Sequence, residues 1–196
     1  MQINAYLHAV AEDNPSIASV IDIGTSTGGN KMYVLKLSNG PGKAGMFMDA
    51  AMNAREWMGV SVILDTIIEL TDNLNINQLM LDKNDFYFLP VANPDGYKHT
   101  WDTNRAWKKT RSSNPGSSCI GTDGNRNWNY VWGDPQNGSS TDWAMGAINL
   151  SHSFTMDLPS GGSLGFNPPP ADITRITTET WAAIKVFADS IPTTRG

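Results

Sequence analysis

Met46-Phe47-Met48-Asp49, followed closely by Asn53-Ala54-Arg55-Glu56-Trp57, is the stretch of sequence that decides the fold. The first group lies in a strand-like run over residues 44–51, which Gly45 interrupts. A helical pattern begins near the second group, because apolar residues recur with helical spacing at Val60, Ile63, Leu64, Ile67 and Ile68. A strand that runs directly into a helix is the repeating unit of α/β proteins, so this fold class is expected.

The segments around this stretch also alternate between helix and strand signals. Residues 3–11 have helical character. Strand signals come from residues 20–23, 32–37 and 86–92. The turn Thr27-Gly28-Gly29-Asn30 joins the first two strands into a predicted hairpin, and Asn93-Pro94-Asp95-Gly96 is expected to close the third as a turn. The apolar run over 86–92 is typical of a strand covered on both faces, so we expect a mixed sheet sandwiched by helices.

The C-terminal half has weaker patterns. Residues 103–138 are polar and rich in Gly, Ser, Asn and Trp, which predicts a long loop. Residues 153–157 indicate a strand, and residues 177–191 a last helix with one apolar face formed by Trp181, Ile184, Ala188 and Ile191. Cys119 is the only cysteine, and we expect either a buried, inert thiol or one that is free or intermolecular.

Composition limits the function classes. A chain of 196 residues with 40% hydrophobic residues can bury one sizeable core, which predicts one domain. The net charge of -5 argues against nucleic acid as a partner. No run of 18 apolar residues occurs, so no membrane span is expected. The first residues, Met1-Gln2-Ile3-Asn4, lack the basic and then apolar layout of a signal peptide, so none is expected in this chain.

Four blocks, taken with their order and spacing, resemble the zinc metallocarboxypeptidases of the pancreatic carboxypeptidase A/B type. They are residues 53–57, 88–97, 104–112 and 119–128. The resemblance implies an extracellular α/β protein with a mixed sheet, a catalytic zinc ion, and hydrolysis of the C-terminal residue of peptides. It also implies that peptide or protein C-termini are the partners.

The resemblance covers nearly the whole chain but implies one large internal deletion near Gly133 and Asp134. We therefore expect a single truncated domain over residues 1–196, in which 1–133 matches the N-terminal part of the family domain and 134–196 its C-terminal part. The deleted part would hold at least one internal strand and the third zinc ligand, a histidine. His152 superficially mimics that histidine, but its surroundings match the strand of the catalytic carboxylate instead.

The zinc ligands implied by the resemblance are incomplete. Glu56 matches the family's carboxylate ligand, whereas Asn53 stands where the family has its first histidine. A catalytic zinc ion needs three protein ligands and an open position for water, and an asparagine amide is a poor substitute for imidazole. Tight zinc binding by this chain is therefore not expected.

The residues that would act on the substrate are also changed. Asp157 stands at the family's glutamate base, one methylene shorter, and Lys108 stands at the arginine that polarises the scissile carbonyl. A displacement of about 1 Å can cost on the order of 100-fold in rate, and lysine lacks the planar fork of arginine. We therefore predict an impaired or inactive enzyme.

A carboxylate-binding group is retained. Asn125 and Arg126 match the pair that grips the substrate's terminal carboxylate. By the same resemblance, Arg105 and Arg55 match subsite residues, and Thr141, which is small and uncharged, implies an A-like apolar preference. An alternative for Arg126 is an ion pair with Asp123 or Asp142, and for Arg55 a solvated or ion-paired side chain.

Three hypotheses follow. The chain is a family member that has lost its catalytic activity, a module that binds peptide C-termini without cleaving them, or a fragment that cannot fold stably because the missing strand exposes sheet edges. The substitutions at Asn53, Lys108 and Asp157 lie outside the deletion, and truncation alone does not account for them.

Overall fold

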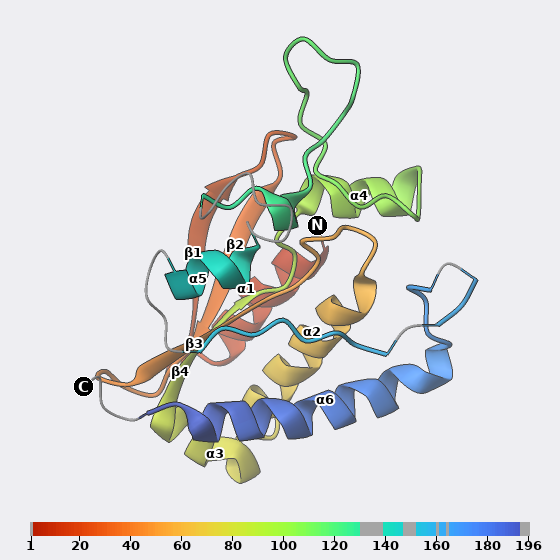
Figure 1. Cartoon of the computed structure of the whole chain (residues 1–196). Helices are drawn as coiled ribbons and strands as arrows, with labels where there is room; N and C mark the ends of the chain where they lie inside the picture. The colour runs from red at the N-terminus through yellow and green to blue at the C-terminus, as the bar shows by residue number, and fades with distance from the viewer. Residues whose placement is uncertain (1, 130–138, 147–151, 160, 164, 193–196) are drawn as a thin grey trace.

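The computed structural model describes residues 2–129, 139–146, 152–159, 161–163 and 165–192. Figure 1 shows the helices and strands in space. Their bounds, in chain order, are α1 Gln2–Asp13, β1 Ala18–Thr25, β2 Lys31–Leu37, β3 Ala44–Asp49, α2 Trp57–Thr71, α3 Leu74–Lys83, β4 Asn84–Leu89, α4 Pro94–Asp102, the 3-10 turn η1 Gly124–Arg126, α5 Ser140–Gly146 and α6 Pro170–Ser190.

The sheet is mixed, as the sequence predicts. Its order is β1-β2-β4-β3. The β1–β2 and β2–β4 pairs are antiparallel, with Leu35 opposite Phe88, whereas β3 and β4 are parallel, with Met46 beside Phe86. The predicted hairpin is confirmed, and a register shift between Asp22 and Gly24 bends β1. Within the described residues β3 has one neighbour only, so it forms an edge of the sheet.

One face of the sheet carries the main core. Leu35, Leu37, Phe86 and Phe88 are all fully buried, and they belong to one apolar cluster with residues of four helices. Those residues are Leu7 and Val10 of α1, Met58, Val62, Ile63, Ile67 and Leu70 of α2, Met80 and Leu81 of α3, and Ile176, Trp181, Ile184 and Ala188 of α6. The C-terminal helix α6 packs mainly on α2 and therefore belongs to the same core as the N-terminal strands.

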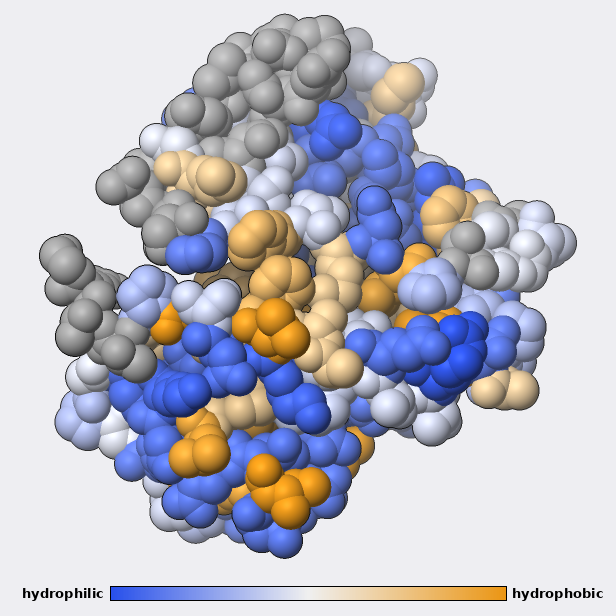
Figure 2. All heavy atoms as spheres, turned by 60° about the horizontal axis from the view of Figure 1, so that its bottom comes forward, coloured by the Kyte–Doolittle hydropathy of each residue, from blue (hydrophilic) through white to orange (hydrophobic). Residues whose placement is uncertain are grey.

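Figure 2 brings the side of α3 and α6 forward and shows separate apolar patches within a largely hydrophilic surface. Exposed apolar residues on these helices include Ile76, Leu79 and Val186. No helix in the described ranges is both long and apolar enough to cross a membrane.

Several predicted elements are confirmed with shifted ends. Helix α1 covers the predicted residues 3–11, and α6 begins at Pro170, ahead of the predicted residue 177. The predicted strand over 86–92 is β4, which ends at Leu89. Loop structure is confirmed for 103–129, apart from η1 and an isolated bridge between Ser113 and Ile120, and residues 130–138 lie outside the described ones.

Three expectations are wrong. The first concerns the turn expected at Asn93-Pro94-Asp95-Gly96. This segment begins α4 instead, because Asn93 caps the helix and Pro94 occupies its first turn. Residues 153–157 form no strand, since the described segment 152–159 has no regular secondary structure and does not belong to the four-stranded sheet. Instead, Phe154 stacks on Phe187 of α6 with ring centroids 5.0 Å apart. The expectation of a buried thiol is also wrong, since Cys119 is exposed.

Asp95 joins the β1–β2 hairpin to α4. Its Oδ1 accepts hydrogen bonds from Ser26 Oγ and Asn30 Nδ2, and its Oδ2 accepts from Gly28 N at 2.9 Å and Thr27 Oγ1 at 3.2 Å. Partial burial alone would raise the pKa of this carboxyl, but the hydrogen bonds outweigh burial and the pKa lies below its ordinary value. The hairpin turn and α4 are therefore fixed to one another by a charged group.

Candidate functional site

The loop between β3 and α2 carries the candidate metal residues. It leaves the sheet at Ala50, whose N–H donates to Leu89 O and whose carbonyl accepts from Ala92 N at 2.8 Å. The next residue, Ala51, has a φ of 53°. This left-handed conformation is unusual for alanine and reverses the chain at the end of β3. The loop is then held against a second one, since Ala54 N donates to Lys108 O at 2.9 Å.

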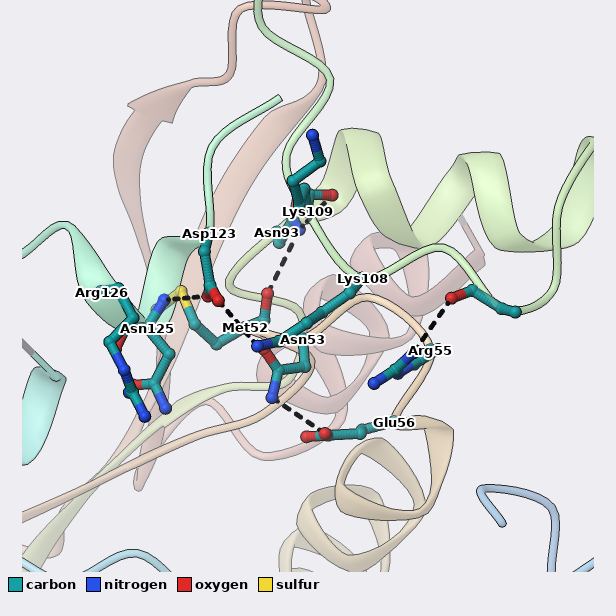
Figure 3. A network of polar contacts seen from close by, with 11 residues as sticks. Met52, Asn53, Arg55, Glu56, Asn93, Lys108, Lys109, Asp123, Asn125 and Arg126 are labelled. Atoms are coloured by element: carbon teal, nitrogen blue, oxygen red, sulfur yellow. Dashed lines mark hydrogen bonds and ion pairs between the residues drawn. The ribbon is translucent and has the colours of Figure 1, made fainter. Parts of the chain in front are cut away.

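Asn93 braces both loops. Its Oδ1 accepts from Gly96 N at 3.0 Å, which caps α4, and its Nδ2 donates to Met52 O at 3.2 Å and Lys109 O at 3.1 Å (Figure 3). One buried amide thus positions three chain segments around the site.

The two predicted metal residues lie together and contact each other. Asn53 Nδ2 donates to Glu56 Oε1 at 2.9 Å (Figure 3). Asn53 Oδ1 is buried and has no hydrogen-bond partner among the described residues, whereas Glu56 is exposed. The retained carboxylate is therefore hydrogen-bonded to the amide that stands in place of the histidine.

The described residues fit a zinc ion poorly. No three side chains of His, Cys, Asp or Glu converge anywhere in the described part of the chain. His152 is exposed and its ring lies 6.2 Å from that of Phe154, so it does not join Glu56 in such a group. With one carboxylate and a neutral amide, the donor set lacks the three ligands of a catalytic site.

Lys108 forms an ion pair at the centre of the site. Its Nζ lies 2.7 Å from Asp123 Oδ2. Partial burial alone would raise the pKa of the Asp123 carboxyl, but the hydrogen bond and charge of Lys108, with smaller contributions from Asn125 and Arg126, lower the pKa below its ordinary value. The lysine at the carbonyl-polarising position is therefore already engaged with a carboxylate.

The predicted carboxylate clamp lies on the turn that follows. Asn125 and Arg126 belong to η1, and Asp123 Oδ1 accepts from Asn125 N at 3.1 Å. Arg126 is exposed, and its Nη1 donates to Asn125 O at 2.7 Å. It forms no ion pair with Asp123, and the side chain of Asp142 lies outside the described ones.

Arg105 and Arg55 contact aromatic rings and backbone, and no described contact links them to the clamp. Arg105 lies over the Trp57 ring at 3.7 Å and donates to Arg55 O and to Asn167 Oδ1. Arg55 is half-buried, lies over the Phe166 ring at 4.2 Å and donates from Nη1 to Ala106 O at 3.4 Å, and it forms no ion pair with another described residue. A cavity of about 140 Å³ is lined in part by Trp57, Arg105, Phe166 and Asn167.

The aromatic contacts extend to α4. Trp57 stacks on Trp101 with centroids 4.0 Å apart and planes inclined by 11°, and its Nε1 donates to Thr100 Oγ1 at 2.9 Å. The start of α2 is thus fixed to α4 by the contacts of Trp57 with Trp101. Residues 166–167 pack on the same side chains, because Asn167 accepts from Arg105 and the Phe166 ring lies against Arg55.

The last two predicted residues, Asp157 and Thr141, make no described contact with the pair of Asn53 and Glu56. Asp157 is exposed on the irregular segment 152–159, where it makes no hydrogen bond or ion pair with another described residue. Thr141 lies on α5, and its Oγ1 is 2.8 Å from Ser139 Oγ. The ring of Trp143 on α5 lies 5.2 Å from that of Trp128, which places α5 beside the segment that carries the clamp.

Sequence reasoning missed two positioning residues. The sequence suggests Asp123 only as a partner of Arg126, whereas the carboxylate pairs with Lys108. The turn signal at Asn93 hides a second one, because asparagine followed by proline is also typical of a helix N-terminus and indicates the capping role of Asn93. The pairing of Lys108 with Asp123 has no local signal, because 15 residues separate the two.

Comparison with known proteins gives a consistent result. The family model described as zinc carboxypeptidase matches residues 3–137 and 134–183. Carboxypeptidase B of Bos taurus is 43% identical over 135 residues, which cover 66% of this chain and 32% of that protein. Zinc carboxypeptidase A 1 of Anopheles gambiae is 34% identical over 160 residues, which cover 80% of this chain and 37% of that protein. The chain thus spans about a third of the curated relatives it matches.

Solved structures are similar in fold. Bovine thrombin-activatable fibrinolysis inhibitor, solved in complex with tick carboxypeptidase inhibitor, matches with a TM-score of 0.63 and 36% identity over 67% of this chain and 43% of that one. Carboxypeptidase A from Helicoverpa armigera matches with a TM-score of 0.65 and 31% identity over 70% of this chain and 35% of that one. These matches support the α/β fold with its mixed sheet.

Proposed function

Because this chain belongs to the zinc carboxypeptidase family, we propose that it binds the C-terminal carboxylate of peptides without hydrolysing the terminal peptide bond. The observation that carries the proposal is the hydrogen bond of 2.9 Å from Asn53 to Glu56. In this bond the retained carboxylate of Glu56 accepts from a neutral amide. The turn η1, which carries Asn125 and Arg126, remains on the surface.

The loss of hydrolysis follows from the chemistry of the retained groups. A zinc ion lowers the pKa of bound water and polarises the scissile carbonyl, and it needs three protein ligands to do so. Asn53 and Glu56 supply one charged donor between them. Lys108 is paired with Asp123, and Asp157 lies on an irregular segment, so neither the carbonyl nor the water has its acting group in place.

The retention of binding follows from Asn125 and Arg126. A guanidinium presents planar donors that match both oxygens of a carboxylate, and an asparagine amide adds further donors. Arg126 is exposed on a turn that Asp123 caps, so its donors are held at the surface. Thr141, on the neighbouring α5, is small and uncharged, which favours an apolar C-terminal side chain.

Peptide binding tests the proposal directly. A peptide that ends in leucine with a free carboxylate is titrated into the protein by calorimetry, beside the same peptide with a C-terminal amide. We expect the free acid to bind at least tenfold more tightly, and Arg126→Ala to abolish the difference, because hydrogen bonds to a charged group contribute about 1.5–3 kcal/mol. Arg175→Ala, on the distant helix α6, is the matched control. Equal affinity for acid and amide would refute the binding proposal.

Zinc and catalysis are tested separately. The protein is titrated with zinc against a competing chelator, with Glu56→Gln as control, and release of phenylalanine or leucine from a peptide C-terminus is followed in the presence of zinc. We expect no stoichiometric site and no release. One equivalent bound tightly and lost in Glu56→Gln, together with zinc-dependent release, would show that the chain is a working enzyme.

The family resemblance also implies an extracellular location, which we keep as part of the proposal. Separation of source tissue into secreted and cellular material, followed by detection with an antibody, tests it. Recovery of the chain in the cellular fraction alone would contradict it.

A further inference from the structure

We propose that Asp123 is an internal counter-ion that withholds Lys108 from the peptide's terminal carboxylate and thereby limits the affinity of the clamp. This inference rests on the proposed binding function and adds a residue that regulates it. Arg126 and Asn125 then grip the carboxylate without Lys108, which joins them only when Asp123 releases the ammonium group.

The geometry of the pair supports this role. Lys108 Nζ is 2.7 Å from Asp123 Oδ2, and the two side chains are 36% and 31% exposed. The pair is therefore formed but remains open to solvent, so an incoming anion has access to the ammonium group. A lysine ammonium is a compact charge on a flexible stem and can exchange one oxygen partner for another without a change in the backbone.

The same carboxylate is tied to the clamp. Asp123 Oδ1 accepts from Asn125 N at 3.1 Å, while Oδ2 faces Lys108 (Figure 3). The turn is seated on the candidate metal loop, because a Cβ at Gly124 would lie 2.7 Å from Met52 Sδ. Asp123 therefore lies between Lys108 and the residues that would hold the ligand, and its charge acts on both.

The charge balance gives the direction of the effect. Lys108 and Asp123 together carry no net charge, so Arg126 is the one unbalanced cation among Lys108, Asp123, Asn125 and Arg126. Removal of the negative charge at residue 123 leaves two cations for one anion. Partly exposed ion pairs contribute about 0.2–1 kcal/mol, which corresponds to a gain in affinity of up to about fivefold.

Asp123→Asn is the informative variant, because an asparagine oxygen still caps Asn125 but no longer carries charge. We expect it to bind the free-acid peptide about two- to fivefold more tightly than the wild type at 50 mM salt, with a smaller gain at 500 mM salt. The double variant Asp123→Asn/Lys108→Met has the same local charge as the wild type and is the matched control. Its affinity is expected to lie within twofold of the wild type.

Two results would overturn the proposal. In the first, Asp123→Asn binds no more tightly than the wild type. In the second, the double variant binds as tightly as Asp123→Asn, so that Lys108 takes no part. If Asp123→Asn fails to fold, Asp123→Ser takes its place, since a serine hydroxyl also caps a helical turn.

A second measurement separates this proposal from the binding function. Brief acetylation with acetic anhydride, followed by mass spectrometry, gives the reactivity of each lysine without any peptide. An ammonium held by a carboxylate is acylated slowly, so Lys108 is expected to react at least twofold faster in Asp123→Asn while the other lysines keep their rates. If the wild type shows no preference for the free-acid peptide, the binding proposal fails. If the reactivity of Lys108 is the same in Asp123→Asn as in the wild type, the counter-ion role of Asp123 is refuted, whatever the peptide titration shows.

Discussion

Truncation of Ile184 to alanine is expected to lower the free energy of unfolding by about 3 kcal/mol. Ile184 is 1% exposed and lies on α6, in the core that α6 shares with α2 and the sheet. The change deletes three buried carbon atoms, which are worth about 2.4 kcal/mol at about 0.8 kcal/mol each. The remaining cavity adds about 1 kcal/mol, and the better helix propensity of alanine returns about 0.4 kcal/mol.

Val186→Ala is the matched control, because Val186 lies two residues away on the same helix and is 68% exposed. Its effect is expected to stay within about 0.5 kcal/mol. Equilibrium unfolding in urea, followed by tryptophan fluorescence and far-UV circular dichroism, measures both variants. For a chain of this size, 3 kcal/mol corresponds to a fall in Tm of roughly 6–12 °C.

The comparison tests whether residues 1–196 form one truncated domain, a prediction that concerns folding and is independent of catalysis. A single transition, shifted strongly by Ile184→Ala and little by Val186→Ala, means that α6 unfolds with the sheet. Equal, small effects of the two variants would refute the reasoning and support an unstable fragment, in which the C-terminal helix is not part of the cooperative core.

Three further changes are expected to have defined effects. Asn93→Ala removes the α4 cap and two hydrogen bonds to backbone carbonyls, so the free energy of unfolding measured in urea should fall by about 2 kcal/mol. Asn127→Ala, at an exposed residue, should change this free energy by no more than about 0.5 kcal/mol. Because the pKa of Asp95 is lowered in the folded protein, its carboxylate stabilises the fold at pH values above the unfolded pKa of about 3.9. This stabilisation is lost as the pH falls through the lower pKa of the folded state. The Tm of Asp95→Asn should therefore fall less steeply than that of the wild type below about pH 4. Gly28→Ala should lower Tm more than Gly29→Ala, because its Cβ would lie 2.7 Å from Asp95 Oδ1, whereas the alanine at Gly29 meets only the strain of a φ of +81°.

The parts of the fold that could be predicted are those with a local apolar period. The helix with Val60, Ile63 and Ile67 buries these residues, as its spacing indicates, and the face with Trp181 and Ile184 is buried on α6. In both cases burial in an apolar cluster and local periodicity favour the same structure. The hairpin was predictable for the same reason, since turn chemistry and strand patterns agree there.

The errors have tertiary causes. Residues 153–157 have an alternating pattern typical of a strand, but a strand also needs a pairing partner, and here Phe154 packs on Phe187 of α6 instead. Helix α3 was missed because Ile76 and Leu79 are exposed, so its apolar residues do not form a single buried stripe. The structure of each of these segments depends on the tertiary neighbours of the segment, and the local sequence holds no information about them.

The candidate site was predictable where its residues are close in sequence. Asn53 and Glu56 are three residues apart and contact each other, and Asn125 and Arg126 lie on one exposed turn. The ion pair of Lys108 with Asp123 joins two parts of one long loop, and its formation depends on how that loop closes. Arg105 illustrates the same limit, because its aromatic partner Trp57 comes from another segment.

The stack of Trp57 on Trp101 supplies an internal optical reporter. Indole rings whose centroids are 4.0 Å apart have transition dipoles that couple strongly, so this stacked pair adds a signal of its own to the spectrum of the seven tryptophans. Arg105 lies over the same Trp57 ring and donates to Asn167, which connects the pair to the C-terminal third of the chain. The near-ultraviolet circular dichroism of the wild-type protein therefore follows the docking of that segment during refolding, without a label or a ligand.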